Sequence, residues 1–134
     1  MKKLKAILVD DEEASRITLR NYLAKYCENV DLIGESSNIN EGYRLIQKVK
    51  PDLVFLDVEM PFGNAFDLLE KFERLDFEVV FVTAFSKYAL EALNLSASNY
   101  LLKPLDIDQL IEAVGKVTLA IEDKSIVRSS SILL

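Results

Sequence analysis

The sequence predicts an α/β fold in which a doubly wound parallel sheet is covered by helices on both faces. Short apolar runs, the clearest at residues 53–56 and 79–82, alternate with segments whose apolar residues recur at helical spacing. These runs are continuous rather than alternating, as in strands buried on both faces of a parallel sheet. Strands that alternate with helices are joined by right-handed crossovers, so few topologies remain.

The first two strand–helix units occupy about fifty residues. A strand is expected over residues 5–9, and the segment after it carries apolar and small residues at helical spacing: Ser15, Leu19, Tyr22, Leu23 and Tyr26. The second strand, about residues 31–35, is more polar, which predicts an edge strand. Asn38 with Glu41 three residues later is typical of a capped helix start, and Pro51 ends that helix.

The other three units follow the same pattern. Their strands are expected at residues 53–56, 79–82 and 99–102. The helix after each strand has a residue that can cap its N-terminus: Asn64, Ser86 and Asp106, the last with Gln109 three residues later. Five such (βα) units predict the strand order 2-1-3-4-5, which is the flavodoxin-like arrangement.

A single domain is expected over residues 1–121, because half of the 134 residues are hydrophobic and can fill one core. Helical periodicity fades afterwards, so residues 122–134 are expected to be a linker or the truncated start of an output region. One cysteine, Cys27, rules out an internal disulfide and favours a reducing compartment, here the cytoplasm. The apolar run before Asp10 is too short for a signal peptide, and no membrane association is expected.

Charge and composition exclude several functions. The net charge of −6 repels phosphate backbones, so this segment is not expected to bind nucleic acid by itself. The chain has no histidine, which excludes histidine-based acid–base catalysis, histidine metal ligands and a histidine phosphodonor within it.

Polar residues stand where four of the five predicted strands end. They are Asp10 and Asp11, Asp57, Thr83, and Lys103. Ligands of such sheets bind outside the carboxyl ends of the strands, where the strand order reverses, so these side chains should meet at one edge. A carboxylate inside a buried strand would be costly, so Asp57 is expected at the strand's end, and Pro61 shows that the strand has stopped.

This set of side chains suits phosphoryl chemistry. Clustered carboxylates repel one another and call for a cation, and hard oxygen ligands suit Mg²⁺. The metal and Lys103 would neutralise a phosphoryl group, and the Thr83 hydroxyl would donate to it. Asp57 is then left as the nucleophile that forms an acyl phosphate. Each residue alone also has a structural explanation, and only the joint pattern favours a site.

On these motifs the chain resembles the receiver domain of two-component response regulators over residues 5–119. The motifs are Val9-Asp10-Asp11-Glu12, Leu56-Asp57-Val58-Glu59-Met60-Pro61, Val82-Thr83-Ala84 and Lys103-Pro104. The resemblance implies that Asp57 accepts a phosphoryl group from a sensor histidine kinase. It implies a regulatory phosphoacceptor rather than an enzyme, limited to Mg²⁺-dependent self-phosphorylation and self-dephosphorylation.

The resemblance also implies roles for the residues around Asp57. Asp11 would bind Mg²⁺ directly, Asp10 would bind it through water, and Asp57 and the main-chain carbonyl of Glu59 would complete the protein ligands. Thr83 and Lys103 would hold the phosphoryl oxygens, and Lys103-Pro104 would be a cis peptide.

A switch is implied as well. Tyr100 matches the aromatic residue that turns inward when Thr83 shifts toward the phosphoryl group, although ordinary strand packing also explains a tyrosine there. The face formed by the fourth helix, fifth strand and fifth helix would then favour a homodimer. Residues 88–93 and 99–104 are similar to regulators with a LytTR-type DNA-binding output domain, which would supply any DNA contact and is absent here.

One departure and three other functions stay open. The family usually has glycine where this chain has Ala65, with Gly63 two positions earlier, which puts the shape of that loop in doubt.

A Mg²⁺-dependent phosphatase could use Asp57 as nucleophile with Glu59 as its acid, but cap elements are missing. A flavin carrier would need a first loop that cradles phosphate, and the acids after Val9 would repel it. A degenerate receiver that works by protein contact alone would not need the full set of reacting groups.

Overall fold

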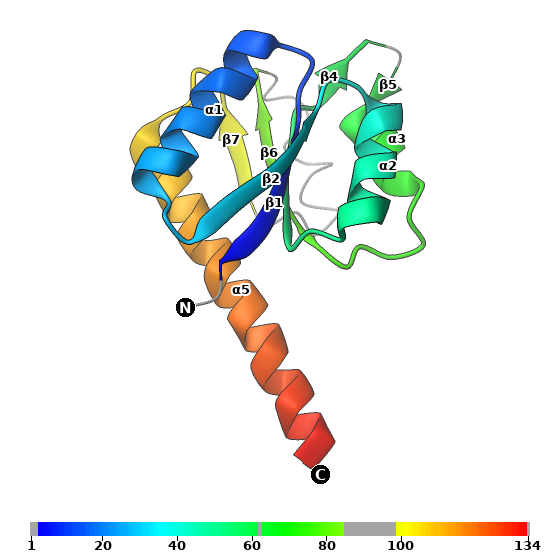
Figure 1. Ribbon diagram of the computed structural model, residues 1–134, viewed down its shortest axis with the longest axis vertical. Coiled ribbons are helices and arrows are strands. Elements are labelled where there is room, and N and C mark those ends of the chain that lie inside the picture. The colour runs from blue at the N-terminus through cyan, green and yellow to red at the C-terminus, as the bar shows by residue number, and fades with distance from the viewer. Residues whose placement is uncertain (1–2, 62, 85–98, 134) are drawn as a thin grey trace.

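A five-stranded parallel sheet lies at the centre of the computed structural model, which describes residues 3–61, 63–84 and 99–133, the stretch from 125 onward by its backbone alone. Figure 1 shows the sheet between its helices. Its strands, in spatial order, are β2 (Val30–Ser36), β1 (Leu4–Val9), β3 (Leu53–Leu56), β6 (Glu78–Thr83) and β7 (Asn99–Leu102). All four neighbouring pairs are parallel. The predicted fold and strand order are therefore confirmed, with the more polar second strand at an edge as expected.

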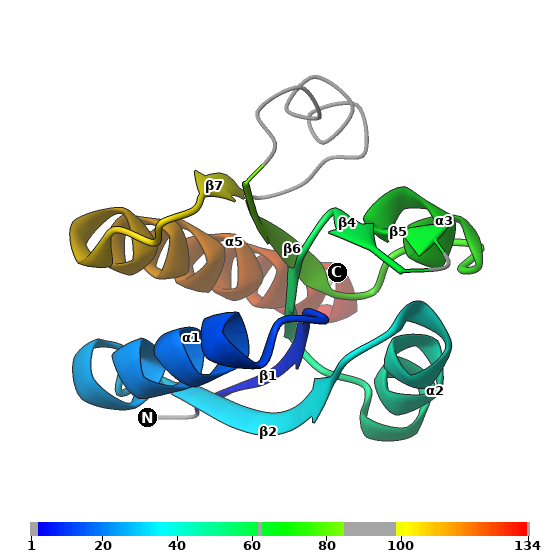
Figure 2. The same ribbon diagram turned by 90° about the horizontal axis from the view of Figure 1, so that it is seen from above.

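Helices cover both faces of the sheet (Figure 2). They are α1 (Glu13–Tyr26), α2 (Ile39–Val49), α3 (Ala65–Glu70) and α5 (Ile107–Leu133). Helices α1 and α5 lie on one face, and α2 and α3 lie on the other. The fourth helix predicted to begin at Ser86, and the stretch 88–93, lie outside the described residues.

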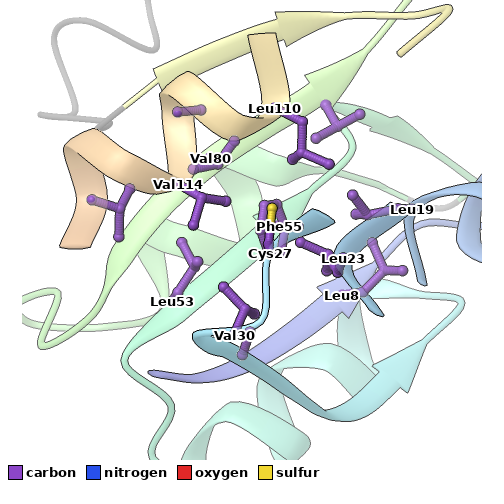
Figure 3. Packing of buried hydrophobic residues seen from close by; sticks show 14 of the residues in the cluster. Leu8, Leu19, Leu23, Cys27, Val30, Leu53, Phe55, Val80, Leu110 and Val114 are labelled. Carbon is purple, nitrogen blue, oxygen red and sulfur yellow. The ribbon is translucent and has the colours of Figure 1, made fainter. Parts of the chain in front are cut away.

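Each face of the sheet has its own apolar core. Phe55 on β3 points into the core under α1 and α5, where Figure 3 shows it with Leu23, Cys27 and Leu110. Val54, the next residue of β3, belongs to the opposite core under α2 and α3. Adjacent residues of a strand point to opposite faces, so a wholly apolar strand such as β3 can be buried on both sides.

Capping residues begin three of the described helices, as the sequence predicts. Asn38 Oδ1 accepts a hydrogen bond from the Glu41 main-chain N–H at 2.9 Å, and Asp106 Oδ1 accepts one from Gln109 N–H at 3.0 Å. Asn64 forms a capping box with Asp67, whose carboxylate accepts from the Asn64 N–H in return. These bonds fix where the chain turns from the sheet edge into each helix.

The loop after Asp57 forms a small hairpin that the sequence analysis does not predict. Strand β4 (Glu59–Met60) pairs antiparallel with β5 (Gly63–Asn64). Gly63 has a φ of +148°, and a Cβ there would lie 2.6 Å from Ile39 Cδ1, so the position requires glycine. Ala65 is buried at the start of α3 and donates its N–H to the Val58 carbonyl at 2.8 Å. The glycine two positions earlier therefore shapes this loop, and an alanine fits at Ala65.

Helix α5 is longer than the sequence pattern indicates. Residues 122–133 are helical, whereas the fading periodicity predicts a loss of regular structure there. Lys124 Nζ lies 2.7 Å from Glu78 Oε2 at the start of β6, and Asn29 Nδ2 donates to Thr118 Oγ1 at 2.9 Å. These long-range contacts hold the helix against the sheet, and its later turns extend beyond the sheet (Figure 1). A domain boundary at residue 121 stays a prediction.

Within the described part of the chain, none of the helices is both long enough and apolar enough to cross a membrane.

Candidate functional site

The register of the sheet brings the ends of four strands to one edge. Val9 lies beside Leu56, and Leu56 beside Phe81. The Asp57 N–H donates to the Val9 carbonyl at 3.0 Å, so the chain leaves β3 next to the end of β1. On the other side, the Lys103 N–H donates to the Thr83 carbonyl at 2.8 Å. The residues that follow these strands therefore surround one point, as the sequence analysis expects.

The ammonium group of Lys103 lies at the centre of this cluster of side chains. Its Nζ is 2.9 Å from Asp10 Oδ2, 3.1 Å from Asp57 Oδ2 and 2.9 Å from Glu12 Oε1. The contact with Glu12 is not predicted from the sequence, although Glu12 directly follows the acid pair. In this state one cation serves three carboxylates, so adding a second cation would relieve repulsion among them.

Three carboxylates at the site could hold a metal ion. Asp10, Asp11 and Asp57 each offer an oxygen atom, and these atoms lie within 4.8 Å of one another. Asp10 is 2% and Asp57 5% exposed, whereas Asp11 is more accessible. Asp57 Oδ1 is buried and has no hydrogen-bond partner among the described residues. Hard oxygen donors of this kind, with one oxygen left unsatisfied, fit Mg²⁺.

Comparison with known proteins agrees with this geometry. The family profile of the response regulator receiver domain matches residues 6–115, which is most of the chain. This chain belongs to the response regulator receiver family. Domains of this family are regulatory phosphoacceptors rather than enzymes in the usual sense.

Relatives of this receiver domain are longer proteins. An uncharacterized response regulatory protein of Vibrio cholerae is 42% identical over 115 residues, which cover 85% of this chain and 48% of that protein. The sensory transduction protein LytT of Bacillus anthracis is 34% identical, with 84% and 46% covered. The transcriptional regulatory protein BtsR of Escherichia coli is 37% identical, with 85% and 48% covered. The receiver domain thus spans about half the length of these relatives.

Solved receiver domains have the same fold. The receiver domain of AraT from Geobacillus stearothermophilus is 28% identical, with a TM-score of 0.82, and 91% of this chain and 98% of that chain are covered. The response regulatory domain of mrkE from Klebsiella pneumoniae is 27% identical, with a TM-score of 0.81, and 90% and 99% are covered.

The surroundings in the receiver site shift the pKa values of both Asp57 and Lys103. Burial, followed by the negative charge of Asp10, raises the pKa of Asp57 to about 6, against the opposing effects of Lys103 and of a hydrogen bond from Thr83. Burial alone would lower the pKa of Lys103, but hydrogen bonds to Glu12 and Asp10 and the charges of Asp10 and Asp57 raise it instead. Lys103 is therefore a permanent cation, while Asp57 is held in a high-energy ionised form.

Both predicted switch residues are among the residues that the structure describes. Thr83 ends β6 and its side chain is fully buried. Tyr100 on β7 is partly buried, with its ring centroid 5.9 Å from that of Phe81. The Lys103–Pro104 peptide bond is cis. Glu59 begins β4 two residues after Asp57, and the role of its carbonyl as a metal ligand stays a prediction.

The raised pKa of Asp57 predicts how stability depends on pH in the absence of metal. A carboxyl whose folded pKa, about 6, exceeds its unfolded value of 3.8 stabilises the fold below pH 4, and this stability is lost as the pH rises through 6. We therefore expect Asp57→Asn to be more stable than wild type at pH 7 in EDTA, by roughly 1–2 kcal/mol after solvent screening.

Thermal melts of both proteins between pH 4 and pH 8 check this expectation. The difference in melting temperature should appear between pH 4 and pH 7 and level off above. Titrating groups remote from Asp57 contribute equally to both proteins and cancel in the difference. A difference that does not change with pH would contradict the raised pKa.

Proposed function

We propose that this receiver domain is a switch operated by phosphorylation of Asp57, with a sensor histidine kinase as donor and Mg²⁺ as cofactor. One observation carries the proposal: Asp57 presents a buried, unsatisfied oxygen beside a lysine ammonium and two further carboxylates. This arrangement costs stability in the resting protein, and a purely structural site would gain nothing from it.

The transfer step follows from the chemistry of these groups. An ionised oxygen of Asp57 attacks the phosphorus atom of a phosphohistidine, and the P–N bond breaks as the new P–O bond forms. The histidine of the donor leaves with the bonding electron pair, and Asp57 becomes an acyl phosphate. Asp11, Asp10 through water, Asp57 and the Glu59 carbonyl would hold Mg²⁺ at this site, where the ion would supply positive charge beside the phosphoryl oxygens.

Lys103 is placed to respond to the new group. Its ammonium already touches Asp57 Oδ2 and would transfer its hydrogen bonds from Asp10 and Glu12 to phosphoryl oxygens. The Thr83 hydroxyl would donate to another phosphoryl oxygen, and the space it vacates would admit Tyr100. Both residues lie on neighbouring strands, so the change would reach the β7 and α5 face of the domain.

That face is suited to a homodimer in the phosphorylated state. Leu102 on β7 and Ile111 on α5 are 44% and 43% exposed, although both are large apolar residues. Large apolar side chains that solvent reaches can contribute to a protein interface where they share one surface. We propose that phosphorylation favours the dimer through this face.

The output is proposed from the relatives. The receiver spans about half of proteins whose names include LytT and a transcriptional regulatory protein. Its stretches 88–93 and 99–104 are similar to LytTR-type regulators. We propose a LytTR-type DNA-binding region in the full protein as the means of transcriptional control. The kinase donor and this output would both act in the cytoplasm.

The test uses acetyl phosphate as a small phosphodonor. We expect intact-mass spectrometry to show one added phosphoryl group when Mg²⁺ is present and almost none in EDTA. Size-exclusion chromatography with light scattering should show a larger dimer fraction in the labelled sample. Equal labelling with and without Mg²⁺ would contradict the metal site, and no labelling in either buffer would contradict the function.

A further inference from the structure

Arg16 holds the peptide unit that joins Asp10 to Asp11. Its guanidinium Nη1 donates to the main-chain carbonyl oxygen of Asp10 at 2.7 Å. Arg16 lies in the first turns of α1, and its own N–H donates to the Glu12 carbonyl at 3.1 Å. The side chain therefore reaches back from the helix across the acidic loop. Charged hydrogen bonds of this length are among the stronger ones in proteins.

A second contact holds the guanidinium from the other side. Arg16 Nε lies 3.8 Å from Glu35 Oε1, near the carboxyl end of β2. Glu35 in turn accepts two hydrogen bonds from Arg20, at 2.6 and 2.9 Å. This pairing with Arg20 holds the pKa of the Glu35 carboxyl below its usual range. The Arg16 side chain is thus fixed between the edge strand and the acidic loop, and solvent reaches little of it.

The carbonyl bond completes the polar contacts of Asp10. The Asp10 N–H donates to the Ser36 carbonyl at 3.0 Å, Oδ1 accepts from the Glu12 N–H at 2.9 Å, and Oδ2 accepts from Lys103 at 2.9 Å. Because a peptide group is planar, fixing the Asp10 carbonyl also fixes the direction in which the chain enters Asp11. One hydrogen bond can therefore orient both carboxylates.

We propose that Arg16 is a positioning residue for the divalent cation: by fixing the Asp10 carbonyl, it orients the Asp10 and Asp11 carboxylates toward Asp57. This inference rests on the proposed Mg²⁺ site. Groups that orient metal ligands without touching the metal commonly contribute about 10–100-fold to metal affinity. Arg16 is not identified by the sequence analysis, because its contact with the Asp10 carbonyl depends on where α1 starts.

Whether the loss of Arg16 weakens or tightens Mg²⁺ binding distinguishes a positioning role from a simple effect of its charge. A guanidinium near a cation site opposes cation binding, so removing its charge alone would tighten Mg²⁺ binding. Losing an orienting hydrogen bond would weaken it. Arg20 provides a matched control, because it also pairs with Glu35 but makes no contact with Asp10 among the described residues.

The experiment measures Mn²⁺ binding by electron paramagnetic resonance, which reports the concentration of free Mn²⁺. Competition by added Mg²⁺ then gives the Mg²⁺ affinity. We expect Arg16→Met to weaken Mg²⁺ binding about 10-fold and Arg20→Met to change it less than about twofold. Both variants lose a partner of Glu35, and Arg16→Met also loses the bond to the Asp10 carbonyl, so its melting temperature in EDTA should fall at least as far as that of Arg20→Met. Arg16→Lys keeps the charge but not the planar fork, and it should lose about threefold in affinity.

Three results would overturn the inference. The first is Arg16→Met with wild-type or tighter Mg²⁺ affinity. The second is an equal loss in Arg16→Met and Arg20→Met, which would assign the effect to the pairing with Glu35. The third is an unchanged Mg²⁺ affinity in Arg16→Lys, and this result would overturn the inference even if Arg16→Met did not fold. Absence of Mn²⁺ and Mg²⁺ binding in the wild type would instead remove the proposed function itself.

Discussion

Replacing Asp57 by asparagine should reduce phosphoryl incorporation from acetyl phosphate and Mg²⁺ to background, a loss of at least about 100-fold. The amide has nearly the same shape as the carboxylate but lacks an ionised oxygen that could attack phosphorus. Intact-mass spectrometry after a fixed incubation measures the labelled fraction. Because the substitution also removes a buried negative charge, the variant should fold at least as stably as wild type in EDTA, so lost labelling cannot be assigned to unfolding.

Asp52→Asn is the matched control for this experiment. Asp52 stands just before the opposite end of the same strand, β3, and accepts a hydrogen bond from the Lys5 N–H at 2.8 Å. It is remote from the cluster around Lys103, so the variant should label as wild type does. Labelling of Asp57→Asn at the wild-type rate would show that the phosphoacceptor has been assigned wrongly.

Lys103→Met should have the largest effect on stability in the absence of metal. Among the described residues, the ammonium of Lys103 is the one cation paired with the side-chain carboxylates of Asp10 and Asp57, and both carboxylates are buried. Removing one partner of a buried ion pair leaves an uncompensated charge, which typically costs about 3 kcal/mol or more. For a domain of this size that corresponds to a fall in melting temperature of roughly 10 °C.

Mg²⁺ should reverse part of this loss. With the ammonium gone, it no longer competes with the divalent cation for Asp10 and Asp57, so the rise in melting temperature on adding Mg²⁺ should exceed that of wild type. Phosphorylation should still be slower than in wild type, because the lysine no longer neutralises the phosphoryl oxygens.

Lys116→Met is the control for charge removal. Lys116 pairs with Glu112 one turn away on α5 at 3.3 Å, and its side chain is 60% exposed. Exposed pairs of this kind contribute about 0.5 kcal/mol or less, so its melting temperature should hardly change. Equal losses in Lys103→Met and Lys116→Met would show that the cluster around Lys103 is not a strained buried site.

Most of the fold follows from local signals in the amino-acid sequence. Residues 53–56 form a continuous apolar run and residues 100–102 a shorter one after Asn99, and the strands found there have the predicted bounds, 53–56 and 99–102. Asn38 caps a helix by accepting one hydrogen bond from the N–H of Glu41, three residues later. Asn64 caps another through a reciprocal pair of hydrogen bonds with Asp67, also three residues later. Such patterns reflect contacts between residues a few positions apart, so they can be identified without the rest of the chain.

The parts that were not predicted depend on contacts between distant residues. Strands β4 and β5 have two residues each, too few for any periodicity, and their turn depends on the space left beside Ile39 for Gly63. The extra turns of α5 follow a polar stretch that also suits a linker, and contacts such as Lys124 with Glu78 hold the helix in place.

The candidate site shows the same division. The order of strand ends placed Asp10, Asp57 and Lys103 at a common edge from the sequence alone, because parallel strands in a fixed order bring their carboxyl ends together. The contacts of Glu12 with Lys103 and of Arg16 with the Asp10 carbonyl could not be predicted, because both depend on the angle at which α1 leaves the sheet.

The sequence by itself determined the α/β topology and the chemical types of the groups at the sheet edge, since both follow from apolar periodicity and from the residues at strand ends. Only the tertiary structure decided how the charges are shared, with one ammonium serving three acids and one oxygen of Asp57 left without a partner among the described residues. The physical reason is that charge–charge energies depend on separation and burial, and a local pattern of residues fixes neither of these.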